Sequence, residues 1–398
     1  MNKKLLAIAV AAALAPVAAM ADSGNVVIYG QVNVSYDLVD PGLNGGGGQR
    51  VSQVNDNQSR LGFKGTEDVG NGVSAVWQIE SAIAADGTAP SGSGAAGTPS
   101  TAQNTGGSIA AGTTLGQRNT FVGLSSKTAG TAILGRHDTP YKISTRGLDM
   151  FADGIADNRN LMGQGVPGVT TFDGRQSNVV AYISPTVSGV TGAIGYVAGA
   201  ENAYLSNATK KGDAWSAMVN YGNGPVYASL AYERHNVGFG TVGTGTSGTL
   251  GVANAIADKS EHAWKLGLGY TMDAFKVNFA YEKTGDDFAA NLCSAGTDDC
   301  GHNTYYLAGG YTMGNNVLKL AYTKQGDLGS STNTGAKQWA LGVDHNMSKR
   351  TSLFALYTKL NNDTNRANGL LGASNGGVTG LNAGSSPSAW SFGMRHSF

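Results

Sequence analysis

The feature that most constrains this chain is an alternation of apolar and polar side chains, repeated over segments of about ten residues. It is clearest in residues 274–283, where the two faces carry opposite kinds of side chain. One face has Phe275, Val277, Phe279 and Tyr281, and the other has Lys276, Asn278 and Glu282. A period of two predicts a β-strand. A charged face opposite an aromatic one fits a strand between lipid and water and does not fit a sandwich core.

Such segments recur along the chain, and short turns alternate with long polar loops as the connections between them. The predicted strands are residues 25–37, 59–67, 73–83, 117–126, 131–139, 175–184, 190–199, 213–221, 226–236, 261–271, 274–284, 303–313, 317–325, 336–347, 351–360 and 388–398. An even number of strands puts both termini on the short-turn side, as in bacterial barrels. We therefore predict an all-β fold, a 16-stranded antiparallel transmembrane β-barrel with short periplasmic turns and long extracellular loops. The clearest long loops are residues 84–116, 237–260 and 362–387.

The beginning of the chain has the pattern of an export signal. Lys3 and Lys4 precede an apolar run from Leu5 to Ala15, and Ala19-Met20-Ala21 provides a small-x-small cleavage site. The apolar run is shorter than the roughly 20 residues that a membrane-spanning helix needs. We predict that residues 1–21 are a cleaved signal peptide and that residues 22–398 form a single barrel domain.

Composition and charge narrow the classes of function. The 27 basic and 27 acidic side chains balance, whereas nucleic-acid binding leaves a basic footprint. The 60 glycines occur without a collagen-like period. We expect no nucleic-acid partner, no cofactor and no metal site.

Several stretches resemble the Gram-negative general porins of the neisserial and beta-proteobacterial type. They are SRLGFKGTEDVGNGVSAVWQIES (59–81), RNTFVGLSSKTAGTAILGRHDTPY (118–141), GRQSNVVAYISPTVSG (174–189), VVIYG (26–30) and GMRHSF (393–398). The resemblance implies a homotrimer in the outer membrane of a Gram-negative cell, surrounded by lipid and lipopolysaccharide. It implies a water-filled channel for passive diffusion of ions and small hydrophilic solutes, and no enzyme activity.

The resemblance also implies a constriction inside the barrel. In such porins the third extracellular loop folds into the lumen, and here that loop spans about 141–174. Wall arginines face this loop in the family. The matching positions are Arg60, Arg118 and Arg175, with Arg136 as a fourth candidate and Glu80 as a wall acid; the loop candidates are Asp149, Asp153 and Asp157. Rings of charged side chains set ion preference in pores. Because the wall cluster is basic, we expect a mild preference for anions.

Strand alternation provides a check on some of these positions. Arg60 lies opposite in parity to Leu61 and Phe63, and Glu80 to Ile79, so both are expected to face the lumen. The same argument puts Arg175 on the face away from Val180 and Tyr182. For Arg118 and Arg136 the alternation leaves the facing open, because each shares its parity with apolar residues. For the loop aspartates, simple solvation stays an alternative to a role in the constriction.

Cys293 and Cys300 are the two cysteines of the chain and lie in one loop, CSAGTDDC. In an exported chain such a pair indicates a disulfide. A metal pair is the alternative, with His302 as the one nearby histidine, but such a ligand set is a weak signal. The acidic loop Thr297-Asp298-Asp299 suits a divalent cation only loosely, because the spacing of an EF-hand is absent.

Two other classes of function stay open at this point. A barrel enzyme, such as a lipase or protease, needs a nucleophile with a base. The six histidines are scattered and no G-x-S-x-G elbow is present. A surface adhesin is the third class, since long loops serve binding. Steady ion conductance separates a channel from both.

Overall fold

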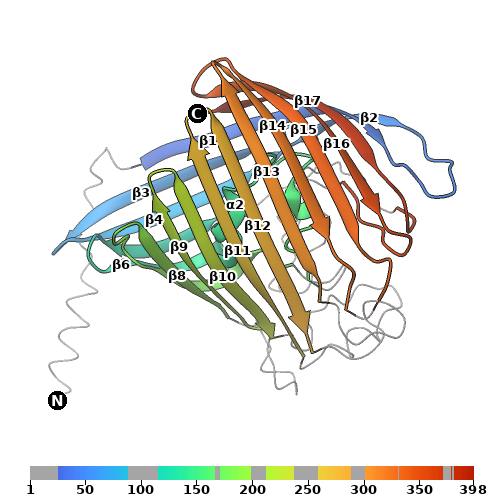
Figure 1. The fold of residues 1–398 in the computed structure, drawn as a ribbon. Coiled ribbons are helices and arrows are strands. Elements are labelled where there is room, and N and C mark those ends of the chain that lie inside the picture. Colours follow the sequence, from blue (N-terminus) through green and yellow to red (C-terminus); the bar gives the residue numbers. More distant parts are fainter. Residues whose placement is uncertain are drawn as a thin grey trace.

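The computed structural model describes residues 26–87, 115–165, 171–198, 212–236, 259–287, 301–329, 331–370, 378 and 381–398. Within these residues the strands pair antiparallel in chain order, and β1 also pairs with β17, so the sheet closes into a barrel (Figure 1). Closure removes the free sheet edges that would otherwise expose unpaired backbone groups. The predicted all-β transmembrane barrel is thereby confirmed.

The strands have the following bounds. They are β1 (Val26–Asp40), β2 (Val51–Asp56), β3 (Arg60–Gly70), β4 (Val73–Ala82), β5 (Thr120–Ser126), β6 (Gly130–Asp138), β7 (Arg175–Ile183), β8 (Val190–Val197), β9 (Ala214–Asn223), β10 (Val226–Asn236), β11 (Ser260–Met272), β12 (Phe275–Asp286), β13 (Asn303–Met313), β14 (Asn316–Gln325), β15 (Ala336–Asn346), β16 (Thr351–Asn362) and β17 (Ser388–Ser397).

β2 and β3 are two parts of one barrel strand. Both pair with β1, β2 along Val34–Val39 and β3 along Val26–Gln31. Between them, residues 57–59 lie opposite only residues 32–33, so the strand carries one extra residue, a β-bulge. Gln58 in this bulge takes a positive φ of 62°. With β2 and β3 counted as one strand, the barrel has the predicted sixteen strands.

The structure corrects the first hairpin. We predicted that the first strand ends at residue 37 and the second begins at residue 59. Instead β1 continues to Asp40 and β2 begins at Val51. The bulge explains why the prediction missed β2. Its extra residue breaks the alternation of apolar and polar side chains that would have identified residues 51–56 as part of the strand.

The alternation of faces is as predicted along the strands. On β12, Phe275 and Val277 are more than half exposed, whereas Asn278 and Glu282 are buried. The exposed apolar side chains therefore point outward, to where lipid would lie, and the polar ones point into the barrel. The short turns use residues that tolerate positive φ: Asn71 and Gly72 have φ of 54° and 71° between β3 and β4.

The last residue closes the barrel against the first strand. The backbone N–H and C=O of Phe398 bond to those of Gly30, with both N–O distances at 3.1 Å. The Phe398 ring occupies the space where any side chain at Gly30 would lie, since a Cβ there would be 2.6 Å from Cζ of the ring. Glycine at this position therefore lets the terminal aromatic ring pack on β1.

Helical structure in the described residues is confined to α2 (Pro140–Arg146) and η1 (Asn158–Asn160), both between β6 and β7. Among the described residues, no helix is long and apolar enough to cross a membrane.

Some predictions concern segments outside the described residues. They are the signal peptide at residues 1–21, the pair Cys293 and Cys300, and most of the loop 84–116.

Candidate functional site

The connection between β6 and β7, residues 139–174, folds into the barrel, and we call it the inward loop. It begins with α2, where the Thr139 hydroxyl accepts a hydrogen bond from the Lys142 N–H and Pro140 occupies the first turn. The helix packs against β9, β10 and β11 (Figure 1). Apolar side chains that follow are almost completely buried. They are Leu148, Phe151, Ile155, Leu161, Met162 and Phe172.

Glycines on the inner face of the barrel make room for this loop. A Cβ at Gly267 on β11 would lie 2.8 Å from the Leu148 side chain, and one at Gly342 on β15 would lie 2.9 Å from Phe151. Real Cβ atoms do not approach so closely, so these positions require glycine as long as the loop stays where it is. Glycines at inward-facing strand positions are therefore a sequence signal for an inward loop. We did not use this signal in the sequence analysis.

A buried ion-pair cluster fastens the inward loop to the wall. The Lys265 ammonium on β11 lies 2.6 Å from Asp173 of the loop and 3.3 Å from Glu282 on β12. The Tyr141 hydroxyl donates to Glu282 at 2.8 Å, and the Gly163 N–H donates to the other oxygen of that carboxylate at 2.8 Å. The loop is thus held at its beginning, middle and end. None of these groups was predicted as functional.

A second polar cluster holds the end of the loop. His235 on β10 lies between Glu233 and Glu261, with nitrogen–oxygen distances of 2.8 and 2.6 Å. The Phe172 ring of the inward loop stacks on the His235 ring at a centroid distance of 4.6 Å. Sequence reasoning treated His235 only as one of six scattered histidines.

The predicted loop aspartates gather around two arginines of the same loop. Arg146 lies 2.6 Å from Asp157, 2.8 Å from Asp153 and 3.5 Å from Asp149. Arg159 lies 2.9 Å from Asp157. Burial acts to raise the pKa of Asp157, but the two guanidinium groups outweigh it and hold that pKa well below its ordinary value. Burial and the nearby Asp157 charge raise the pKa of Asp149 to about 6.

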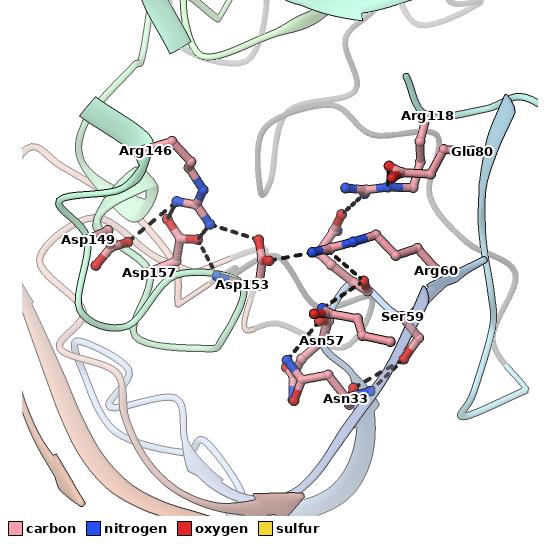
Figure 2. A network of polar contacts seen from close by, with 12 residues as sticks. Asn33, Asn57, Ser59, Arg60, Glu80, Arg118, Arg146, Asp149, Asp153 and Asp157 are labelled. Atoms are coloured by element: carbon pink, nitrogen blue, oxygen red, sulfur yellow. Dashed lines mark hydrogen bonds and ion pairs between the residues drawn. The ribbon is translucent and has the colours of Figure 1, made fainter. Parts of the chain in front are cut away.

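Asp153 extends from this cluster to the opposite wall of the barrel. Its carboxylate contacts Arg60 of β3 at 3.5 Å, and Figure 2 shows it lying between Arg146 on one side and Arg60 on the other. The Asp153 and Arg60 side chains are 26% and 25% exposed, far more than Asp157, which is completely buried. Of the three loop aspartates, Asp153 is therefore the one open to water.

The bulge between β2 and β3 organises the wall around Arg60. The Gln58 carbonyl accepts a hydrogen bond from Arg60 at 3.3 Å, and its side chain accepts one from Arg118 at 2.6 Å. Arg118 also pairs with Glu80 at 2.6 Å (Figure 2). Tyr29 donates to Glu80 at 3.0 Å. Arg118 precedes β5, so strand alternation does not apply to it.

Arg175 and Arg136 lie in a neighbouring group around Asp138. Arg175 contacts Asp138 at 3.2 Å and donates to Asn119 at 2.7 Å. Lys142 of α2 lies 2.8 Å from the same carboxylate. Arg136 donates to a main-chain carbonyl ahead of β5 at 2.9 Å.

The alternation argument does not hold at Arg175. The register between β6 and β7 shifts, with His137 opposite Gln176 but Gly135 opposite Val179. The extra residue is accommodated at Asn178, which has a φ of 59°. Gln176 therefore shares the face of Val179, and Arg175 is buried by its contacts at the strand end rather than by parity.

The structure thus sorts the predicted site residues into three places. Arg60, Glu80, Arg118 and Asp153 meet in one network; Asp149 and Asp157 lie beneath it in the inward loop; Arg136 and Arg175 flank it. Sequence reasoning missed Gln58, Tyr29, Asp138 and Lys142. Asp138 lies in the stretch RHDTPY that carries the family resemblance, which is the signal that could have found it.

In the part of the chain that the structure describes, no group of His, Cys, Asp and Glu side chains has a metal-binding arrangement. The network is instead a set of charges that joins the inward loop to the barrel wall.

A family model described as Gram-negative porin matches residues 7–365. The chain belongs to the Gram-negative porin family. Its relatives include outer membrane porin protein 32 of Delftia acidovorans, which is 28% identical over the whole of both chains. The major outer membrane protein P.IB of Neisseria gonorrhoeae is 27% identical, over 88% of this porin and 91% of that protein. The predicted resemblance is confirmed.

The solved structures agree. An anion-selective porin from Comamonas acidovorans superposes with a TM-score of 0.70 at 25% identity, covering 94% of this porin and 99% of that chain. The porin is thus a channel of the Gram-negative outer membrane through which ions and small hydrophilic solutes diffuse passively.

Proposed function

We propose that this porin prefers anions and that its constriction lies between Arg60 on the wall and Asp153 on the inward loop. The contact between these two side chains carries the proposal, because it joins the loop to the opposite wall at 3.5 Å. Both side chains keep a quarter of their surface exposed. An ion that passes between loop and wall therefore meets these two charges directly.

The balance of charge around the constriction favours anions. The loop aspartates are largely compensated by Arg146 and Arg159 within the loop itself. The basic side chains outnumber the acidic ones. The basic ones are Arg60, Arg118, Arg136, Lys142, Arg146, Arg159 and Arg175; the acidic ones are Glu80, Asp138, Asp149, Asp153 and Asp157. The anion-selective porin with the same fold supports this assignment.

Reversal potential across a potassium chloride gradient in a planar bilayer tests the proposal. We expect the sign that corresponds to a chloride current exceeding the potassium current. A clear potassium preference would refute it. We propose that the protein is neither a barrel enzyme nor an adhesin. Steady ion conductance in the same recordings separates a channel from both.

We further propose a homotrimer embedded in lipid and lipopolysaccharide. β5 and β8 have only 7 and 8 residues, fewer than the roughly 9–11 that span a bilayer. The part of the barrel formed by these short strands suits contact with neighbouring subunits better than contact with lipid. Three equal closing steps in the same bilayer recordings support three channels per complex, and single steps would contradict it.

Anion preference is expected to fall as pH rises from about 5 to about 8. Burial lowers the pKa of Lys142 to about 7, and that of Asp149 is raised to about 6. Over this range Asp149 gains a negative charge and Lys142 loses a positive one, so both changes make the site less positive. Reversal potentials measured at several pH values check this. The K142Q variant is expected to lose the part of the fall in anion preference that occurs near pH 7. An anion preference that rises with pH would contradict the assignment of the fall to Lys142 and Asp149.

We also propose that residues 1–21 are removed as a signal peptide and that Cys293 and Cys300 form a disulfide. The oxidising compartment outside the inner membrane favours the disulfide. Mass spectrometry of the unreduced protein from outer membranes is expected to give a chain beginning at Asp22 with no free thiol. Two alkylatable thiols would refute the disulfide.

A further inference from the structure

Arg366 lies in the connection that follows β16, away from the constriction. This connection turns inward at the mouth of the barrel, since Leu370 is completely buried in the same apolar cluster as Leu161 and Met162 of the inward loop. The Arg366 side chain is itself only 6% exposed. It therefore sits between two loops, with its cationic group largely removed from water.

The partners of the Arg366 guanidinium are neutral. Nε donates to the Asn368 side-chain oxygen at 3.1 Å, and Nη2 donates to that of Gln164 in the inward loop at 2.7 Å. Nη1 donates to none of the described residues and is not sealed within the protein. Burial lowers the pKa of Arg366 to about 10, which still leaves it charged at neutral pH.

This makes Arg366 an exception among the buried arginines of the chain. Of the described residues, the others that are less than a tenth exposed are Arg118, Arg159 and Arg175. Each has a carboxylate at hydrogen-bond distance: 2.6, 2.9 and 3.2 Å, respectively. Arg366 has no carboxylate within 4 Å among the described residues. A buried charge is costly unless a counter-charge accompanies it.

The described residues around Arg366 offer no such counter-charge but do fix its position. Gln325 on β14 donates to the Gln164 side-chain oxygen at 3.1 Å and accepts from Asn368 at 3.0 Å. Gln325 thereby holds the side-chain oxygens of Asn368 and Gln164 toward Nε and Nη2 of Arg366. The Nη1 side of the guanidinium is left as the free edge.

We propose that Arg366 is an anion-binding site at the mouth of the barrel, taking a small oxyanion such as inorganic phosphate or a carboxylate. The planar guanidinium presents paired N–H donors that match such oxygens. The bound anion supplies the counter-charge that the described residues do not provide here. The site does not depend on the ion preference of the constriction, because the two share no residue.

Thermal unfolding of the full-length protein in detergent, titrated with sodium phosphate at constant ionic strength, tests the site. A ligand that binds the folded state raises the unfolding temperature with its concentration. All variants carry R60Q, so that they are compared with the same reduced charge at the constriction. In that background R366Q is expected to lose the phosphate-dependent rise. R50Q is the matched control, because it removes one positive charge from a residue paired with Asp40 on the same rim.

The outcomes separate a binding site from a structural link between loops. If R366Q and R50Q show the same rise as their parent, the site is refuted. If R366Q lowers the unfolding temperature equally at every phosphate concentration, Arg366 is only a structural link and the proposal also fails. Should R366Q not fold, R366K provides the test: it keeps the charge without the forked donors and is expected to need roughly tenfold more phosphate.

Discussion

Replacing Arg60 by glutamine is expected to reduce the chloride-to-potassium permeability ratio about fivefold. Arg60 contacts Asp153 of the inward loop and keeps a quarter of its side chain exposed. At about 4 Å in water a unit charge acts on an ion with roughly 1 kcal/mol, which is about a fivefold effect on local concentration. The substitution also frees Asp153 from one of its basic partners, and the uncovered carboxylate acts in the same direction.

The matched control removes a charge pair instead of a single charge. E80Q/R118Q replaces a buried pair with an N–O distance of 2.6 Å by two neutral amides, with no change in net charge. We expect its reversal potential to stay close to that of the wild type. Reversal potentials of both variants are measured under one salt gradient. An R60Q channel with unchanged selectivity would place Arg60 outside the filter.

Replacing Lys265 by methionine is expected to release the inward loop and widen the channel. Lys265 is completely buried and is the counter-charge for both Asp173 and Glu282. Removing one member of a buried ion pair leaves an uncompensated charge, at a cost of about 3–5 kcal/mol. Two carboxylates would be stranded here. The loop gives way before the barrel does, because the hydrogen bonds between strands do not depend on this cluster.

Single-channel conductance and limited proteolysis measure the release. K265M is expected to show a larger, noisier conductance and cleavage within residues 139–174. The triple variant K265M/D173N/E282Q removes the stranded charges as well and is expected to restore most of the wild-type conductance. A K265M channel with wild-type conductance and protease resistance would show that the apolar packing of the loop holds it without the ion pairs.

Much of the fold was predictable because each strand carries its own signal. The period of two places Phe275 outside and Asn278 inside without knowledge of any neighbour. Turn residues such as Asn71 and Gly72 mark the hairpins in the same local way. Arg60 and Glu80 came from the family resemblance, and the regular alternation around them predicted that they face the lumen. What these residues contact depends on the other wall and on the loop.

The predictions failed where one extra residue interrupts a strand. Gln58 and Asn178 both take positive φ within a strand, and each shifts the parity of the residues beyond it. The Gln58 side chain gives no signal of this, whereas asparagine at position 178 is a residue that tolerates positive φ. The first error hid β2, and the second made the argument for Arg175 incorrect.

The sequence by itself determined a sixteen-stranded transmembrane barrel, because this property follows from local alternation and residue type. Only the tertiary structure decided which charges are compensated. Asp157 lies buried between two arginines of its own loop, Asp153 reaches Arg60 across the lumen, and Arg366 has no acid beside it among the described residues. The physical reason is that a charge acts through its distance to other charges and its exposure to water, and residues far apart in the chain set both.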